Sequence, residues 1–497
     1  MRRCLIFFRH RYVEFRVPEL RALVEMQGYT FVNRAGTDVR LTEGVHEVTA
    51  APPGADPART VVLEGPAGGE PFSPFWYCQV PDGAEVMGAV CARSVLVKAV
   101  VELWGEGDTW EACNAWMREH CTAAHTTEAM REGERFKFHI DYFGTRIPAK
   151  DHRAIFDSLQ WMGGQWRGTV DLQRAEHIFW VVGCRVQPEN GGLPQTIPDR
   201  WYFGRQVAAA PDKLGHALYA LPERRYIGPT SMDNEMAALM ANMAQVRQGD
   251  LSVDPFAGTG SILVALSHLG AKCIGMEWDV RVIRDGKENK RGERVDISSN
   301  YAQYGHLEAP AGLVCDDFSR WALRDGLEGW FDSIVCDPPY GVRESGKTVP
   351  ARDLAGLTPE QRLGHKPTSV PYSLGNVLAD LLDRGSEVLR VGGRLVFFMP
   401  WFEEAAAEEG SEELEVLASH PCLRLLAMSE QVLAARYNRR LVTMEKVAPF
   451  DRAACLGHSR RLREAKLTID AIHAWVFKTS EEMSRDYARS KFRCKAV

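Results

Sequence analysis

The segment 250–279, DLSVDPFAGTGSILVALSHLGAKCIGMEWD, limits the folds open to this chain more than any other. It consists of a short apolar run, a glycine-rich turn, a helix-length apolar segment and a second short apolar run. Short buried strands separated by helix-length segments are typical of right-handed βαβ units. Because similar short runs follow at 311–315, 333–336 and 393–399, the pattern predicts an α/β fold with a mainly parallel, doubly wound sheet.

The turn DPFAGTG at 254–260 lies between the first predicted strand and the helix that follows it. Gly258 and Gly260 allow the backbone to turn sharply and to approach a ligand closely, because they carry no Cβ atom. The turn is not the dinucleotide pattern G-x-G-x-x-G, and no lysine follows as in a phosphate-binding loop. Peptide N–H groups at the start of a helix favour a carboxylate. The turn therefore indicates a ligand with an amino-acid portion.

Acidic residues stand at the ends of three successive predicted strands. Asp254 follows the first strand, Glu277 ends the second and Asp316 follows the third. Glu277 is placed to bind ribose hydroxyls, and Asp316 to meet an adenine amino group. A single acid at a strand end is explained as well by a helix cap or a solvated turn. Together the three acids match the parts of S-adenosylmethionine, which we predict as the cofactor.

The segment FDSIVCDPPYG at 331–341 predicts a buried strand that stops at Asp337. Pro338 and Pro339 cannot donate ladder hydrogen bonds and make the following loop stiff. Asp337 and the carbonyl of Pro338 can accept hydrogen bonds from an exocyclic amine and draw its lone pair out of conjugation, while Tyr340 can stack on a flipped base. The tetrad therefore suits methylation of a planar amino group on adenine, cytosine, guanine or a glutamine side chain. An ordinary turn explains the same four letters.

The composition bounds the class of protein. A chain of 497 residues is long enough for roughly two to four domains. Its 12 cysteines include no C-x-x-C pair, so we expect neither a metal site nor a disulfide framework, and we expect a reducing compartment. No apolar run is long enough to span a bilayer, so we predict a soluble, cytoplasmic protein without a membrane partner.

Charge is distributed unevenly along the chain. The formal net charge is −6, but residues 451–497 carry eleven Lys or Arg against six Asp or Glu. A solvated helical tail and a nucleic-acid patch both explain this balance. In the segment RFKFHIDYFGTRIPAKDHR at 135–153, alternating Phe136, Phe138 and Ile140 predict a buried strand face. The basic residues Lys137, Arg146 and Lys150 are candidates for RNA contact.

Several longer strings resemble one known family. YIGPTSMDNEMAALMANMAQVRQGD, DPFAGTGS, DPPYGVRE and HPCLRLLAMSEQVLAARYNRRLVTMEKV are similar to the catalytic subunits of eukaryotic tRNA guanine-10 N2-methyltransferases, which are THUMP-domain amino-methyltransferases. SPFWYCQVP, VELWGEG and YFGRQVA resemble the N-terminal half of the same proteins. The resemblance implies a Rossmann-like S-adenosylmethionine-dependent methyltransferase domain preceded by an α+β ferredoxin-like/THUMP region.

The domain organisation follows from this resemblance and from a segment rich in proline and glycine. We expect a ferredoxin-like segment at 1–75, a THUMP RNA-binding domain at 76–186, a linker at 187–229, the methyltransferase domain at 230–449 and a basic C-terminal extension at 450–497. The resemblance runs to about Pro449 and does not include the last of these. The segment 342–372 is expected to form a loop over the strand ends.

The resemblance also implies roles for residues and partners. It places the methionine part of the cofactor beside Asp254 and the two glycines, and the guanine amine at the tetrad Asp337, Pro338, Pro339 and Tyr340. The implied cofactor-binding set is Thr230, Ser231, Asp254, Phe256, Gly258, Gly260, Glu277 and Asp316. The ribose acid is usually Asp in this family, so Asp279 is an alternative to Glu277. The expected partners are tRNA and a small zinc-binding activator subunit that forms a heterodimer with the chain.

The sequence thus predicts methyl transfer from S-adenosylmethionine to the N2 amine of a guanine in tRNA, at position 10 by resemblance. Two alternatives remain at this stage: an adenine or cytosine amino-methyltransferase acting on another nucleic acid, and a non-catalytic tRNA-binding scaffold.

Overall fold

The computed structural model describes residues 1–34, 54–83, 85–121, 132–162, 168–186, 196–289, 291–305, 307–324, 326–340, 347–348, 370–401, 412–434 and 437–465. The described part of the chain forms two compact units, which divide between Leu214 and Gly215. None of the helices in these ranges combines the length and the apolarity needed to cross a bilayer.

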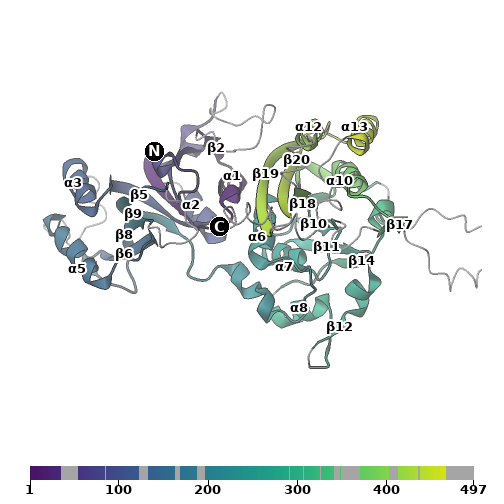
Figure 1. Ribbon diagram of the computed structural model, residues 1–497, viewed down its shortest axis with the longest axis horizontal. Coiled ribbons are helices and arrows are strands. Elements are labelled where there is room, and N and C mark those ends of the chain that lie inside the picture. Colours follow the sequence, from purple (N-terminus) through teal and green to yellow (C-terminus); the bar gives the residue numbers. More distant parts are fainter. Residues whose placement is uncertain are drawn as a thin grey trace, which may run out of the picture. The chain divides into compact units, whose positions relative to one another are not determined.

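The first unit is built on a sheet of nine strands (Figure 1). Across the sheet these are β2 (Thr30–Asn33), β3 (Thr60–Pro66), β4 (Phe75–Val80), β1 (Arg2–Phe8), β5 (Val97–Gly107), β9 (Arg200–Ala209), β8 (His177–Arg185), β6 (Arg135–Gly144) and β7 (Thr169–Val170). Its helices include α1 (Arg16–Met26), α2 (Val86–Arg93), α3 (Trp110–His120) and α5 (Ala149–Ser158). One sheet therefore extends across both regions predicted to precede the linker.

The strand β6 has the buried face that its alternating residues predict. Phe136 is buried, and the half-buried Phe138 and Ile140 pack against the same cluster, which also contains Phe179 of β8 and Phe203 of β9. Strand β9 lies inside the range 187–229 that the sequence analysis assigns to a linker. It forms a strand despite the flanking prolines and glycines because β5 and β8 pair with it on its two sides.

The second unit contains a seven-stranded sheet whose order is β14 (Gly312–Cys315), β11 (Lys272–Glu277), β10 (Leu251–Asp254), β15 (Phe331–Cys336), β18 (Leu389–Trp401), β20 (Tyr437–Lys446) and β19 (Leu423–Ala434). The pairs from β14 to β18 are parallel, and β20 pairs antiparallel with both of its neighbours. The predicted mainly parallel, doubly wound α/β sheet is confirmed. Chain order reverses between β10 and β15, which is where ligands bind in open sheets of this kind.

Helices follow the strands of this unit in the predicted alternation (Figure 1). They are α6 (Asn234–Met243), α7 (Ser261–His268), α8 (Ile297–Tyr304), α10 (Leu374–Val388), α12 (Glu413–Ala418) and α13 (Arg452–Glu464). Two short antiparallel pairs, β12 (Lys287–Glu288) with β13 (Arg294–Val295) and β16 (Lys347–Thr348) with β17 (Val370–Pro371), lie outside the main sheet. Of the loop predicted at 342–372 the structure describes only 347–348 and 370–372, and residues 466–497 of the predicted basic extension lie outside the described residues.

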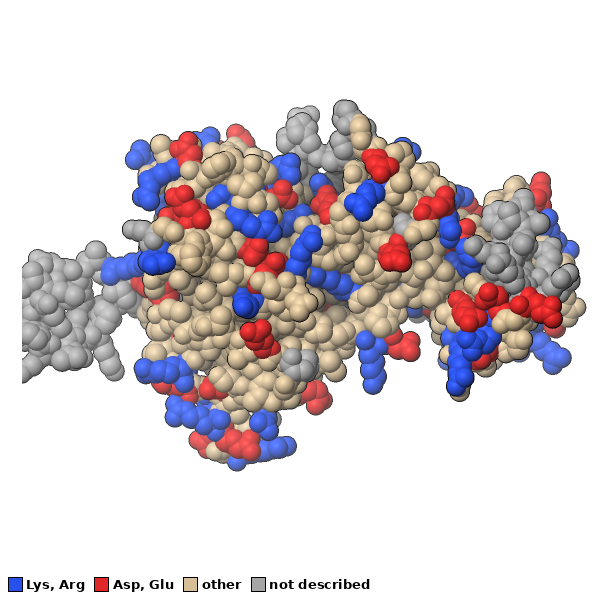
Figure 2. All heavy atoms as spheres, turned by 180° about the vertical axis from the view of Figure 1, so that it is seen from behind, with Lys and Arg blue, Asp and Glu red and all other residues tan. Residues whose placement is uncertain are grey.

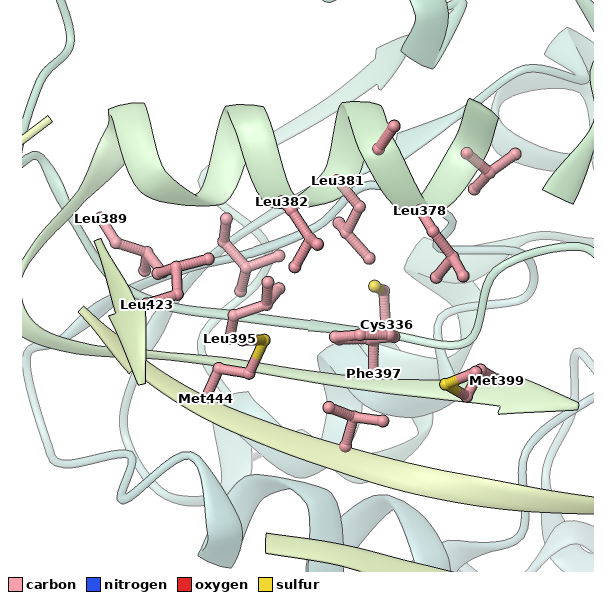
Figure 3. Packing of buried hydrophobic residues seen from close by; sticks show 14 of the residues in the cluster. Cys336, Leu378, Leu381, Leu382, Leu389, Leu395, Phe397, Met399, Leu423 and Met444 are labelled. Carbon is pink, nitrogen blue, oxygen red and sulfur yellow. The ribbon is translucent and has the colours of Figure 1, made fainter. Parts of the chain in front are cut away.

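Helix α10 covers one face of the sheet and supplies much of its core. Ser373 caps the helix by accepting a hydrogen bond from the Asn376 N–H, and apolar residues at helical spacing line its inner face. Figure 3 shows the leucines of α10 directed at side chains from β15, β18 and β20, among them Cys336, Phe397 and Met444. Burial of each large apolar side chain contributes about 1.5–3 kcal/mol. This packing holds the strand ends in fixed positions.

Candidate functional site

Four carboxylates stand at the same edge of the second sheet. Asp254 ends β10, Glu277 ends β11, and Asp316 and Asp337 directly follow β14 and β15. These four strands are neighbours in the order β14, β11, β10, β15 and run in parallel, so their carboxyl ends meet along one edge. The structure therefore brings together the acids that the sequence analysis selected at separate strand ends.

The glycine turn after β10 has the conformation that its sequence predicts. Gly258 and Gly260 have φ values of 49° and 82°, which L-residues with side chains rarely adopt. An added Cβ at Gly258 would point into open space, whereas one at Gly260 would meet Ile297 at 3.2 Å. Helix α7 begins directly after the turn, at Ser261. The turn thus presents bare backbone and a helix N-terminus to the space beside it.

Asp254 is almost completely buried in this turn. Its Oδ1 accepts a hydrogen bond of 3.0 Å from the Phe256 N–H, while its buried Oδ2 has no partner among the described residues. Burial above all, and then the charges of Glu277 and Asp337, raise the pKa of this carboxyl well above its usual value. A positively charged or hydrogen-bond-donating ligand group at Oδ2 would relieve the cost of burying this carboxylate.

Glu277 and Asp279 differ in the groups that hold their carboxylates. Glu277 is half-buried and accepts hydrogen bonds of 3.0 Å from the N–H groups of Gly258 and Asp279, one on each oxygen. Asp279 pairs with Arg281, with a closest distance of 2.6 Å. Glu277 is therefore directed at the glycine turn by backbone donors, whereas the charge of Asp279 is neutralised by a neighbouring arginine.

Asp316 has the same pattern as Asp254. Its Oδ1 accepts a hydrogen bond of 3.0 Å from the Ala322 N–H, and its buried Oδ2 has no partner within the described ranges. Burial is the main cause that raises the pKa of Asp316. Two buried carboxylate oxygens near the ends of β10 and β14 thus lack donors, which is the arrangement expected where a ligand supplies them.

Thr230 and Ser231 lie on the segment that precedes α6. Ser231 Oγ accepts a hydrogen bond of 2.7 Å from the Gly228 N–H and shares one of 2.6 Å with Thr259 Oγ1 in the glycine turn. Thr230 is exposed. The hydroxyl of Thr259 therefore connects two segments of the predicted cofactor site, a role that the sequence analysis did not assign.

The predicted Phe256 supports the turn through an aromatic contact. Its half-buried ring lies 4.8 Å from the ring centre of Phe318, which follows β14. This contact connects the glycine turn to the segment that carries Asp316.

All four residues of the tetrad 337–340 are described, and both oxygens of the Asp337 carboxylate accept hydrogen bonds. The Tyr340 hydroxyl donates to Asp337 Oδ1, and the Arg439 guanidinium donates to Oδ2 at 2.8 Å. Pro338 is buried and Pro339 half-buried. Burial first, and then the charge of Asp337, raises the pKa of Tyr340 well above its usual value, so the hydroxyl keeps its proton and acts as a donor.

Sequence reasoning missed Arg439, although a signal existed. The string YNRRLVTMEK places two adjacent arginines directly before the apolar pair Leu441 and Val442 of a strand, and a buried arginine needs a partner. That partner is 102 positions away along the chain, so no local pattern could identify it.

The three candidates for RNA contact belong to the first unit. Lys137 lies on β6 and donates weakly to the Leu172 carbonyl at 3.4 Å, while Arg146 and Lys150 are exposed in the segment that follows. Figure 2 shows a face on which basic and acidic side chains are interspersed. A nucleic acid on such a surface would contact small groups of basic residues rather than one extended field.

Two family models match the chain. One is described as the Tmrp11 THUMP N-terminal domain and matches residues 69–211; the other is described as the RMKL-like methyltransferase domain and matches residues 222–353. The predicted succession of a THUMP-type region and a methyltransferase domain is confirmed.

Curated relatives match most of the chain. The tRNA (guanine(10)-N(2))-methyltransferase TRMT11 of Rattus norvegicus is 30% identical over 465 residues, which cover 91% of this chain and 89% of the relative. The protein of the same name from Homo sapiens is 29% identical over 472 residues, covering 92% and 91%. Among solved structures, TrmN from Thermus thermophilus is similar with 16% identity and a TM-score of 0.33, covering 76% of this chain and 90% of that one.

Proposed function

This chain belongs to the family of tRNA (guanine(10)-N(2))-methyltransferases named TRMT11, and from that premise we propose that it transfers a methyl group from S-adenosylmethionine to the N2 amine of guanine 10 in tRNA. The observation that carries the proposal is the row of acids at one sheet edge, with a bare glycine turn after β10 and the tetrad 337–340 after the neighbouring strand β15. The similarity to relatives of that name supports guanine over adenine or cytosine.

The described residues fit this cofactor. The unpartnered Oδ2 atoms of Asp254 and Asp316 supply acceptors for an amino group and for an adenine amine. Glu277 is held by two backbone donors, and because each carboxylate oxygen accepts more than one hydrogen bond it can also accept from ribose hydroxyls; its position supports it over Asp279 for this role. Gly258 leaves open the space into which a Cβ would project. S-adenosylmethionine supplies a methyl group on a positively charged sulfur, which leaves as a neutral thioether.

The tetrad's part is to bind and orient the amine. When the amine nitrogen takes up the methyl group that the cofactor would supply, it would become cationic. Asp337 lies where its carboxylate can accept an N–H of the amine and stabilise that developing charge. The cationic nitrogen is strongly acidic, so its proton can leave to this carboxylate or to water. Pro338 and Pro339 hold the loop stiff during this step.

The partners follow from the family. We assign tRNA binding to the first unit, with Lys137, Arg146 and Lys150 as contact residues. The family resemblance also supports a small zinc-binding activator subunit as the partner in a heterodimer. The activator is tested by the reaction described next, and the basic contact residues by the salt dependence of tRNA binding.

The test is to incubate the full chain, with and without its activator, with bulk tRNA and labelled S-adenosylmethionine, and to identify the modified nucleoside. The expected product is N2-methylguanosine. It should be absent when the substrate is a tRNA transcript with adenine at position 10. Methylated adenosine or cytidine would contradict the substrate. Binding of tRNA without methyl transfer in either condition would instead support the scaffold alternative, and the Asp337→Asn variant serves as the inactive control.

A further inference from the structure

We propose that Arg439 is a positioning residue of the methyl-transfer site, and that the Tyr340 hydroxyl occupies the place that the target amine takes on binding. The proposal deepens the proposed function and rests on it, because it concerns the same carboxylate, Asp337. It adds to the site Arg439, which lies on a distant strand of the sheet. It also adds an exchange of hydrogen-bond donors on Asp337, from the Tyr340 hydroxyl to the amine, when the substrate binds.

Arg439 lies on β20, the strand inserted antiparallel between β18 and β19. Its side chain is only 12% exposed. The guanidinium lies 3.9 Å from the ring centre of Phe398, and its Nε donates to Gln431 Oε1 at 2.8 Å. A further nitrogen lies 3.6 Å from Met232 Sδ. A planar cation fixed by an aromatic face, an amide oxygen and a sulfur has little freedom to turn, so it is preorganised for its remaining partner.

That partner is Asp337 Oδ2, at 2.8 Å. Among the described residues, the charged and titratable groups that interact electrostatically with Asp337 include Arg439 from β20, Tyr340 from its own loop, Asp254 from β10 and the buried Cys336 thiol that precedes it. Asp337 and Asp254 oppose each other's ionisation because like charges repel in a partly dry site. Arg439 offsets this repulsion and holds the Asp337 carboxylate in one orientation.

Arg439 binds Oδ2 of this carboxylate, and Oδ1 accepts a hydrogen bond from a second donor. In the structure that donor is the Tyr340 hydroxyl, which also lies 3.4 Å from the Arg439 guanidinium. The N–H of an exocyclic amine is the same kind of group, a neutral donor attached to a planar ring. The hydroxyl therefore stands in for the amine, and base entry exchanges one donor for the other. Release of the hydroxyl leaves the Tyr340 ring available to stack on the base.

The pairing also limits what Asp337 does. A carboxylate bound to a guanidinium is a weaker base than a free one, so Asp337 acts chiefly as an oriented acceptor. Arg439 thus acts through Asp337 and touches no substrate atom.

The experiment measures single-turnover methyl transfer to tRNA by the full chain with its activator, at saturating cofactor, over a range of pH. Arg439→Gln should lower the rate about 10²-fold near neutral pH, and the acidic limb of its pH profile should move to higher pH because Asp337 loses its counter-ion. Arg439→Lys keeps the charge but not the planar fork, so it should lower the rate while leaving the acidic limb close to that of the wild type.

Arg440→Gln is the matched control. Arg440 is the next residue on β20 and is similarly buried, but successive strand residues point to opposite faces of a sheet. Its guanidinium pairs with Glu430 at 3.5 Å and lies over the Trp401 ring. Its loss should lower the melting temperature without moving the pH profile. Cofactor affinity, measured by calorimetry, should stay within about 2-fold of the wild type in all three variants.

Tyr340→Phe tests the exchange of donors separately. It keeps the ring but removes the hydroxyl, so the rate at saturating tRNA should be retained and the apparent tRNA affinity should be unchanged or tighter. A loss as large as that of Asp337→Asn would overturn the exchange. An unshifted pH profile in Arg439→Gln, or the same shift in Arg440→Gln, would overturn the role of Arg439. Failure of the wild type to methylate tRNA guanine would contradict the proposed function instead.

Discussion

The Glu277 carboxylate accepts a hydrogen bond of 3.0 Å from the Gly258 N–H, which ties the end of β11 to the glycine turn that follows β10. Because the donor is backbone, the bond depends on the turn's conformation rather than on a second side chain. The acid proposed for the ribose and the turn proposed for the amino-acid part of the cofactor therefore form one rigid unit.

Replacement of Glu277 should weaken cofactor binding. Glu277→Gln removes the charge and leaves an amide group that cannot accept at both positions, so we expect affinity for S-adenosylmethionine to fall about 10–100-fold, the equivalent of ~1.5–3 kcal/mol for a charged hydrogen bond. Asp279→Asn is the control, since Arg281 already engages that carboxylate. Calorimetric titration of both variants checks this, and a larger loss in Asp279→Asn would reverse the assignment.

Gly258→Val should abolish cofactor binding while the chain stays folded. The added side chain would occupy the open space beside the turn, and a β-branched residue is strained at a φ of 49°. Gly249→Val is matched to it, because Gly249 also has a positive φ, 88°, and nothing within 4 Å of an added Cβ, but it precedes β10 at the opposite end of the strand. Circular dichroism measures the loss of stability caused by backbone strain, which we expect in both variants. Calorimetry measures cofactor binding, which only Gly258→Val should lose.

Asp337→Asn should affect the chemical step. It replaces a charged acceptor by an amide that can present an N–H to the amine and also weakens the pairing with Arg439, so the single-turnover rate should fall about 10²-fold or more. Cofactor affinity should survive, since the acids assigned to the cofactor are unchanged. A near-normal rate at saturating cofactor would mean that the loop is only a turn.

Tyr340→Ala should weaken capture of the base, because it removes the ring as well as the hydroxyl. A base–aromatic stack is worth roughly 1–3 kcal/mol, so apparent tRNA affinity should fall about 10–100-fold. Equilibrium binding of tRNA to this variant checks the prediction. Comparison with Tyr340→Phe, which retains the ring, separates stacking from the hydrogen bond.

Asp254→Asn should stabilise the cofactor-free chain at neutral pH. Burial raises the folded-state pKa of Asp254 well above its value in the unfolded chain, so this group's contribution to stability is complete below the unfolded pKa and declines as pH rises. The amide keeps an acceptor for the Phe256 N–H and carries no charge. Its melting temperature should therefore exceed that of the wild type at pH 7, and the difference should shrink toward pH ~4. A difference independent of pH would show that burial of the charge is not its cause.

Binding of tRNA should depend steeply on salt. Neutralisation of phosphates by basic residues releases counter-ions, so log affinity should fall linearly with log salt concentration. Replacement of exposed Arg146 and Lys150 by Gln should reduce the magnitude of that slope by about 1 for each phosphate that the variant no longer neutralises. Replacement of exposed Arg153, which pairs only distantly with Asp157 at 3.9 Å, provides a comparison within the same unit. An unchanged slope in the double variant would remove these residues from the interface.

Local sequence was sufficient to predict most of the helices and strands of the second unit and many of the residues of the candidate site. Some features act on the backbone over only a few residues: apolar runs of strand length, the glycines of the turn and the prolines after Asp337. The local structure that they cause can therefore be predicted without knowing the fold. The acids could also be grouped in advance, because carboxyl ends of parallel strands must meet at one edge. The strand β9 was missed because its flanking prolines and glycines resemble a linker, and only pairing with β5 and β8 makes it a strand.

Tertiary structure alone decided how each acid is held. The strand order places β20 between β18 and β19, and that insertion brings Arg439 to Asp337 across 102 positions of sequence. The choice between Glu277 and Asp279 likewise depends on which carboxylate the turn's N–H reaches and which one an arginine neutralises. Sequence by itself determined which residues carry charge and where strands stop, because these depend on local chemistry; the pairing of charges depends on non-local packing, which becomes definite only when the sheet is assembled.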